Sequence, residues 1–256
     1  MAEKEHSGLP YVAGLDGLRA LALITIMLFH LGWSRVPGGV FSVSLFFTLS
    51  GYLITQLMIS DHARTGRTDL KHFWYRRLRR LGPGSIIVVL AVTVIALAGV
   101  FTGERLRGDL LATVGYGANW RFATAGTTYA QLFESTPSPL LHFWTLAIEE
   151  QFYVVFPILM AVLLRWRRLM LPTLALLAAL SACAMVLTTS RNVAYYGTHT
   201  RAAEFLIGAL LALVVPMRKE ITKRMQAFFA VGGVIALGVY VYISGTVNAS
   251  DGWLYQ

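Results

Sequence analysis

The chain has 256 residues, of which 56% are hydrophobic and only 14% are charged, and its net charge is +9. This composition lies far from that of a soluble globular domain, and it excludes a secreted module, a coiled coil and a disordered tail. The positive charge alone would suggest nucleic acid, but no groove-reading motif or aromatic and basic surface accompanies it, so we expect no nucleic-acid partner. The single cysteine, Cys183, excludes an internal disulfide, and the six histidines are too scattered to suggest a metal site.

Seven apolar segments of about membrane-spanning length follow one another along the chain. They cover residues 12–33, 40–59, 84–102, 140–164, 169–189, 202–216 and 227–244. We predict a helix in each segment, because lipid accepts only helices or closed barrels as spanning structures. The expected fold is therefore an all-α polytopic membrane protein with a single membrane-embedded domain over residues 1–256.

The basic residues predict the orientation of these helices, since Lys and Arg favour cytoplasmic loops. Residues 61–82 hold a dense group of them, which predicts a basic cytoplasmic loop and a cytoplasmic N-terminus. The weakly apolar stretch 109–122 would reverse all later loops if it crossed the membrane. We therefore interpret it as a re-entrant or interfacial helix within an outer segment, residues 103–139, and we place residues 195–201 in a later outer loop.

Ionisable residues in the first span are functional candidates, because a charge at mid-helix costs about 2.5 to 3.5 kcal/mol on insertion. Arg19 and His30 fall on nearly the same helix face, and Asp16 is spaced to pair with Arg19. The alternatives are a snorkelling anchor for Arg19 and an interhelical hydrogen bond for His30.

The fourth span carries two adjacent carboxyl groups, Glu149 and Glu150, at membrane depth, where they need a cavity or a partner. His142 precedes Glu149 by seven residues and so shares nearly the same face. The flanking aromatic residues are interpreted as an outer aromatic belt: Trp144, Phe152 and Tyr153.

Two further positions allow more than one interpretation. Ser50 and Gly51 in the second span permit close helix packing, while Ser50 also offers a hydroxyl for the cavity that His30 would line. Arg201 either pairs with Glu204, three residues on, or holds an anionic acceptor or orients a carboxylate.

Taken together, these strings resemble acyltransferase family three, the bacterial integral-membrane O-acyltransferases that modify cell-surface glycans and some small molecules. The match runs from about residue 11 to residue 216, and several signatures occur in the family's order. They are Leu15-Asp-Gly-Leu-Arg-Ala ahead of His30, Phe46-Phe-Thr-Leu-Ser-Gly, Phe73-Trp-Tyr-Arg-Arg-Leu-Arg-Arg, Leu141-His-Phe-Trp-Thr-Leu-Ala-Ile-Glu-Glu-Gln-Phe-Tyr and Thr198-His-Thr-Arg.

The resemblance implies a cytosolic acyl-CoA donor, usually acetyl-CoA, a hydroxyl acceptor outside the cytoplasm such as a cell-surface glycan, and no bound cofactor. It makes His30 the essential histidine, Arg19 its partner and Glu149 the first glutamate of its motif. Arg201 matches an arginine that usually follows Asp-Thr, but here His199 stands at the aspartate position. The family has more helices than seven, so we expect the chain to be incomplete at its C-terminal end.

In this scheme His30 is the general base in the bilayer, with Glu149 or Asp16 available to orient it. Ser50, His142 and Arg201 are the expected substrate contacts. The expected contacts to the phosphates of CoA are Arg76, Arg77, Arg79 and Arg80, although the positive-inside rule alone also accounts for them.

Three other functions are compatible with the same residues. A proton-coupled transporter would use the intramembrane His and Glu as a relay, although the chain lacks the internal repeat that transporters often show. An acyltransferase acting on a small molecule such as a macrolide, and a non-catalytic membrane scaffold, are the others. In each case the protein is expected to be a multi-pass protein of the plasma membrane.

Overall fold

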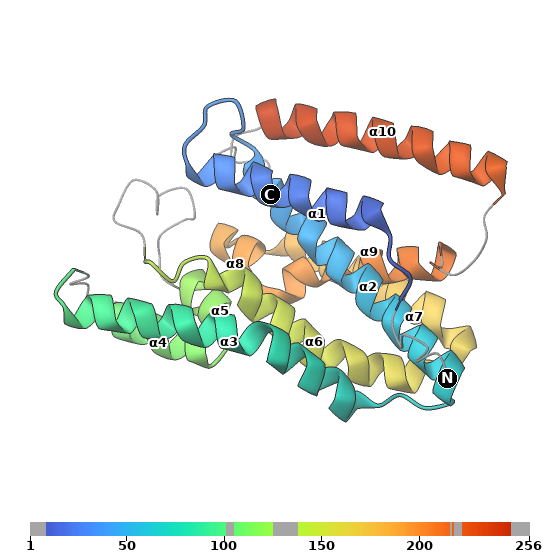
Figure 1. The fold of residues 1–256 in the computed structure, drawn as a ribbon, viewed down its shortest axis with the longest axis horizontal. Helices are drawn as coiled ribbons and strands as arrows, with labels where there is room; N and C mark the ends of the chain where they lie inside the picture. The colour runs from blue at the N-terminus through green and yellow to red at the C-terminus, as the bar shows by residue number, and fades with distance from the viewer. Residues whose placement is uncertain (1–8, 101–104, 125–137, 216, 218–221, 247–256) are drawn as a thin grey trace, which may run out of the picture. The chain divides into compact units, whose positions relative to one another are not determined.

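The computed structural model describes residues 9–100, 105–124, 138–215, 217 and 222–246, and within these residues it contains helices and no strand (Figure 1). The chain divides into two compact units. The first consists of Met1–Ser60 and Glu204–Leu254, and the second consists of Asp61–Ala203 with Tyr255–Gln256.

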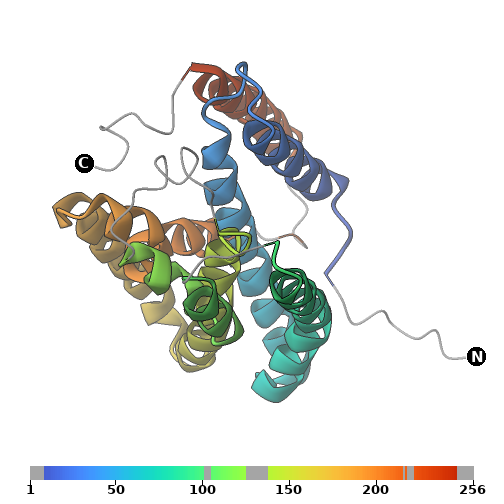
Figure 2. The same ribbon diagram turned by 90° about the vertical axis from the view of Figure 1, so that its left-hand side faces the viewer.

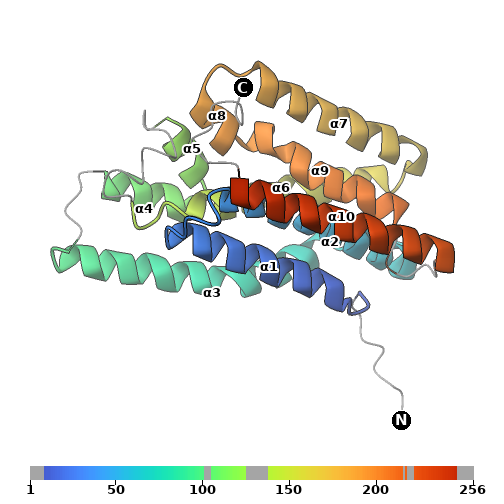
Figure 3. The ribbon, with the colours of Figure 1, turned by 90° about the horizontal axis from the view of Figure 1, so that it is seen from above.

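The first unit is built from α1 (Ala13–His30), the short 3-10 helix η1 (Gly39–Phe41), most of α2 (Ser42–Thr65), the later turns of α9 (Thr198–Val214) and α10 (Lys223–Thr246). Helices α1 and α10 lie side by side in all three views, and both contact η1 (Figures 1, 2 and 3). Only Ala22 and Thr25 of α1 are buried, so most of this helix presents apolar side chains outward.

Helices α2 and α9 approach each other closely because each contributes a glycine to the contact. A Cβ atom on Gly51 would collide with the backbone oxygen of Phe205, and one on Gly208 would collide with that of Thr48. The rings of Phe47 and Phe205 stack beside this crossing with their centroids 4.5 Å apart. The packing interpretation of the second span is therefore confirmed for Gly51, as expected for helices that associate through small residues.

Gln56 of α2 forms hydrogen bonds with backbone groups at the C-terminal end of α9. Its Nε2 donates to the carbonyl oxygens of Ala212 (2.8 Å) and Val215 (3.1 Å), and its Oε1 accepts from the backbone N–H of Met217 (3.3 Å). The last carbonyls of a helix have no partner within the helix, so a buried amide at this point satisfies groups that lipid would leave unpaired.

The second unit contains α3 (Leu70–Leu97), α4 (Leu106–Val114), α5 (Ala118–Ala123), α6 (Phe143–Leu163), α7 (Arg167–Leu187), α8 (Arg191–Tyr196) and the first turn of α9. Helix α6 contacts α3, α4, α5 and α7, which makes it the central helix of this unit (Figure 1).

Among the residues that the structure describes, five helices are long and apolar enough to cross a membrane: α1, α2, α3, α6 and α7. The protein is thus an all-α polytopic membrane protein, as predicted. The predicted sixth span corresponds to α9, which has 17 residues, and the predicted seventh span lies on α10, which has 24.

The predicted loop over residues 61–82 is mostly helical. Helix α2 continues to Thr65 and α3 begins at Leu70, where Asp69 caps it by accepting the backbone N–H of His72 (2.9 Å). The 28 residues of α3 measure about 42 Å, more than the roughly 30 Å of a hydrocarbon core. The basic residues occupy the extra turns of a spanning helix. In the same way, the predicted outer loop 195–201 belongs to α8 and the start of α9.

The single helix predicted over residues 109–122 is two helices, α4 and α5, separated by Gly115, Tyr116 and Gly117. With 9 and 6 residues they measure about 14 and 9 Å, so neither crosses the membrane. Tyr116 has φ = 51°, the only positive φ among the described residues other than glycine.

Candidate functional site

His30 is the last residue of α1 and is half-buried. Its Nδ1 lies 2.7 Å from the carbonyl oxygen of Ile26, one turn earlier. A carbonyl oxygen only accepts, so Nδ1 carries the proton of the neutral ring and the basic lone pair is on Nε2. The turn of helix before His30 therefore selects the tautomer in which Nε2 can take a proton.

Arg19 lies near the other end of α1, about 16 Å from His30 along the helix axis. Its Nη1 is 3.4 Å from Oδ1 of Asp16, which confirms the predicted pairing, and both side chains are partly exposed. Arg19 and His30 therefore lie near opposite ends of α1.

Ser50 is half-buried on α2, beside the Gly51 that meets α9. One and a half turns earlier, Ser44 Oγ donates to Oε1 of Glu204 at 3.0 Å. A hydroxyl and a carboxyl group thus join α2 to α9 within the first unit.

In the second unit, a cationic side chain of α3 lies near the two adjacent carboxyl groups of α6. Glu149 and Glu150 are half-buried in the second turn of the helix, and both interact electrostatically with Arg77 of α3. The guanidinium carbon of Arg77 lies 4.6 Å from the ring centroid of Tyr153, and Nε1 of Trp74 donates to the Tyr153 carbonyl (2.9 Å). The partner that these carboxyl groups need at membrane depth is therefore on α3.

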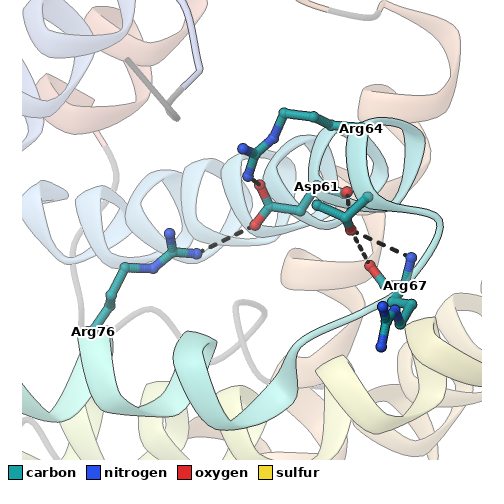
Figure 4. A network of polar contacts seen from close by, with 5 residues as sticks. Asp61, Arg64, Arg67 and Arg76 are labelled. Carbon is teal, nitrogen blue, oxygen red and sulfur yellow. Dashed lines mark hydrogen bonds and ion pairs between the residues drawn. The ribbon is translucent and has the colours of Figure 1, made fainter. Parts of the chain in front are cut away.

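The four arginines predicted to bind CoA phosphates have different surroundings. Arg76 is 3.3 Å from Oδ2 of Asp61, whose Oδ1 is 3.5 Å from Arg64 (Figure 4). Arg77 faces α6, whereas Arg79 and Arg80 are exposed. Only the last two leave their charge open to an incoming anion.

Arg201 is buried, with 5% of its surface exposed, in the first turn of α9. Its guanidinium carbon lies 5.9 Å from the ring of Trp144 and 5.6 Å from that of Tyr195, both buried. The interpretation of an aromatic belt is wrong here: Trp144, Phe152 and Tyr153 are 2%, 8% and 4% exposed, so they face protein rather than lipid. His142, just before α6, is exposed.

A buried amide network, absent from the sequence-based candidates, joins α5, α6 and α9. Asn119 is fully buried and donates to Tyr196 O (2.9 Å) and to Thr198 Oγ1 (3.0 Å). Gln151 donates to Asn119 Oδ1 (3.0 Å) and Tyr116 O (2.7 Å), and accepts from Thr198 Oγ1 (2.5 Å). The only signal in the sequence was the position of Gln151 directly after the two glutamates.

The candidate residues thus fall into two groups. His30, Arg19 and Ser50 belong to the first unit, while Glu149, His142, Arg201 and the arginines of α3 belong to the second. Among the described residues, no group of three or more His, Cys, Asp or Glu side chains is placed to hold a metal ion.

Comparison with known proteins identifies the chain's relatives. A family model described as an acyltransferase domain (Acyl_transf_3) matches residues 12–256. The chain is 36% identical to the O-acetyltransferase OatA of Staphylococcus aureus (strain NCTC 8325 / PS 47), over 96% of its own length and 42% of that protein. It is 37% identical to the peptidoglycan O-acetyltransferase OatA of Listeria monocytogenes (96% and 41% covered) and to the putative peptidoglycan O-acetyltransferase YrhL of Bacillus subtilis (85% and 35% covered).

The chain therefore spans about two fifths or less of these relatives' lengths. No solved structure matches it. The family match covers almost the whole sequence, from just before α1 through α10. The chain belongs to acyltransferase family three.

Proposed function

We propose that this protein is a membrane O-acyltransferase of the bacterial plasma membrane that moves an acetyl group from cytosolic acetyl-CoA to a hydroxyl of a cell-envelope glycan. The observation that carries the proposal is the hydrogen bond from His30 Nδ1 to Ile26, because it leaves the basic lone pair on Nε2 of the family's essential histidine. The proposed donor is a substrate, and no resident cofactor is required.

The chemistry needs one base and one electrophilic carbonyl. Nε2 of His30 removes the proton of the acceptor hydroxyl as its oxygen attacks the thioester carbonyl. The C–S bond then breaks, the sulfur of CoA leaves as a thiolate, and the proton held by His30 neutralises it. A carboxylate stabilises the positive charge that develops on the base during transfer, and Glu149 is the proposed group for this task.

The donor's phosphates are assigned to Arg79 and Arg80. Both are exposed on the basic turns of α3, whereas the charge of Arg76 is partly neutralised by Asp61. Arginine suits this role because its planar guanidinium forms paired hydrogen bonds with phosphate oxygens.

Peptidoglycan is the proposed acceptor, since it appears in the names of the Listeria and Bacillus relatives. Arg201 is proposed to contact this acceptor, because a guanidinium packed between aromatic rings is a rigid site for an anionic group. Ser50 and His142 are the further proposed acceptor contacts.

The test uses membranes that contain the protein, radiolabelled acetyl-CoA and a peptidoglycan fragment as acceptor. His30→Ala should lower acetyl transfer about 100- to 10,000-fold, the usual loss on removing general-base assistance. His72→Ala, at an exposed histidine in the first turn of α3, is the matched control and should leave transfer unchanged.

Two other results would contradict the proposal. Full activity in His30→Ala with loss in His142→Ala would place the base on His142. Uptake of the acceptor or of protons without any transfer of label would favour the transporter.

A further inference from the structure

Two aromatic side chains stack on the surface of the second unit. The indole of Trp120 on α5 and the imidazole of His199 in the first turn of α9 are nearly parallel, with 4° between the ring planes and 5.7 Å between the centroids. Trp120 is 40% exposed, and His199 is exposed as well. Parallel rings in contact lie about 3.5 to 4.0 Å apart, so the longer centroid distance indicates an offset stack that leaves part of each face uncovered.

Hydrogen bonds hold the backbone beside both rings. Asn119, directly before Trp120, donates to Oγ1 of Thr198, directly before His199, at 3.0 Å. Ser181 of α7 donates to the His199 carbonyl at 2.6 Å. Helix α5 also packs against α8, the helix that leads into α9 (Figures 1 and 3). The two rings are therefore positioned before a ligand arrives, which lowers the entropic cost of binding.

The nitrogen atoms of the two rings are open to a ligand. Within the part of the chain that the structure describes, no group forms a hydrogen bond with the indole N–H of Trp120 or with the imidazole nitrogens of His199. An indole donates one hydrogen bond, and a neutral imidazole donates one and accepts one. The pair thus combines an apolar surface with hydrogen-bonding groups at its edge.

This combination fits the pyranose ring of a glycan. The C–H groups on the face of a sugar ring pack on the negative face of an aromatic ring, while the sugar hydroxyls project from the ring edge, where nitrogen atoms bind them. A simple anion is a poorer match, because the cation next to Trp120 in sequence, Arg121, is already paired with Asp109 at 3.2 Å.

Resting on the acyl-transfer function proposed above, we propose that Trp120 and His199 form a sugar-binding platform that holds one pyranose ring of the acceptor glycan. The predicted topology places both rings on the outer side of the membrane, within residues 103–139 and 195–201, where a cell-envelope glycan lies. The platform contributes affinity for the acceptor, and it takes no part in the proton transfer assigned to His30.

The decisive variant is Trp120→Leu, which removes the aromatic face and keeps an apolar side chain at an exposed position. The KM for a soluble peptidoglycan disaccharide in the acetyl-transfer assay should rise about 2- to 10-fold, the usual effect of one aromatic contact, while kcat and the KM for acetyl-CoA stay unchanged. Trp166→Leu, at an exposed tryptophan between α6 and α7, is the matched control and should change none of these constants.

Two variants of His199 separate stacking from hydrogen bonding. His199→Phe keeps a ring against the indole and removes the nitrogen atoms, whereas His199→Ala removes both. The KM for the disaccharide should rise in both variants, and it should rise more in His199→Ala. Adding Trp120→Leu to His199→Ala should cost less than the sum of the two single changes, because the rings contact the same sugar. A KM unchanged in both His199 variants would exclude this residue from the platform.

A second readout does not depend on acetyl transfer. Calorimetric titration of the purified protein with the disaccharide gives Kd directly, and Trp120→Leu should raise it by the same 2- to 10-fold. An unchanged Kd and KM would overturn the inference, and poorer membrane insertion with an unchanged Kd would identify Trp120 as a lipid anchor instead. Weaker binding in Trp120→Leu, in a protein that transfers no acetyl group to the disaccharide, would refute the proposed function and support the platform.

Discussion

Glu149 and Glu150 are neighbours in sequence but differ by about 100° in direction around α6. Glu149 shares its helix face with His142, and Glu150 is turned away from that face. We expect Glu149→Gln to abolish acetyl transfer with near-normal expression, because it removes the carboxylate proposed to stabilise charge on the base. Glu150→Gln should be milder. Labelled acetyl transfer, normalised to the amount of inserted protein, is the measurement.

The reverse ranking of these two variants would reject the assignment of Glu149 to the reaction site. Equal loss of acetyl transfer in the two variants, accompanied by poor membrane insertion, would mean that both carboxyl groups have a structural role.

The contrast between His30 and Asn119 shows which residues near the candidate site the sequence can predict. His30, Arg19 and Glu149 are charged or titratable groups inside apolar segments, so their cost in lipid makes them visible without a structure. Tyr116 and Asn119 lie in a short polar stretch, and their partners Gln151, Tyr196 and Thr198 are 32 to 79 residues away. No periodicity links such positions, so only the fold reveals them.

Among the helices, the α2–α9 crossing should be the most sensitive to small changes. Gly51→Ala and Gly208→Ala each place a methyl group against the backbone of the other helix, which cannot move aside as a side chain can. Each should lower stability by about 1 to 3 kcal/mol, the usual range for overpacking. Thermal unfolding in detergent measures the loss.

Gly84→Ala on α3 is the control for this prediction, since a Cβ there meets nothing within 4 Å. It should leave stability unchanged or raise it slightly, because alanine favours a helix over glycine by about 1 kcal/mol. Equal effects at all three glycines would mean that helix propensity, rather than close approach, sets their cost.

The amide network makes a second prediction about elements. Asn119→Asp keeps the shape of the side chain but removes the N–H group that donates to Tyr196 O and Thr198 Oγ1. An acceptor facing acceptors in a fully buried site should cost about 1 to 3 kcal/mol or more. Thermal unfolding and protease resistance of the 115–124 region should both fall, and an unchanged melting temperature would contradict the importance of this network.

Hydropathy located the spanning elements but misjudged their ends. It detects only residues that lipid accepts, so it began the third span at residue 84, whereas α3 starts at Leu70. Arginine and leucine favour helices, and the capping Asp69 starts one, so the basic stretch continues the helix in water. Hydropathy also placed Arg201 in a loop, because lipid does not accept its charge. In the structure Ser190 caps α8, α9 follows directly, and Arg201 lies in the first turn of α9.

At the scale of the whole molecule, the short lengths of α4 and α5 support the predicted topology, because neither adds a crossing between α3 and α6. Residues 66–69 should then face the cytoplasm and α8 the outside. In a Cys183→Ser background, Arg191→Cys should react with an impermeant maleimide on intact cells, whereas Arg67→Cys should react only after permeabilisation. Both positions are exposed, so their reactivity reports the side of the membrane.

Reaction at both sites after permeabilisation is the control for accessibility. Equal labelling of the two positions in intact cells would contradict the predicted topology.

The Asp61 carboxylate, shared between Arg64 and Arg76, partly neutralises the basic turns of α3, and this has a consequence for the effect of lipid. An anionic phospholipid presents the same phosphate chemistry as CoA, and each basic side chain near a membrane surface attracts it by about 1 kcal/mol. If Arg79 and Arg80 hold the phosphates of CoA, as proposed above, lipid and donor compete for them. The apparent KM for acetyl-CoA in proteoliposomes should rise with the fraction of anionic lipid, and Asp61→Asn, which releases two more arginines, should make that rise steeper. A KM independent of lipid charge would place the phosphates of CoA on other residues, whereas the expected rise would make anionic lipid a competitive inhibitor whose strength depends on Asp61.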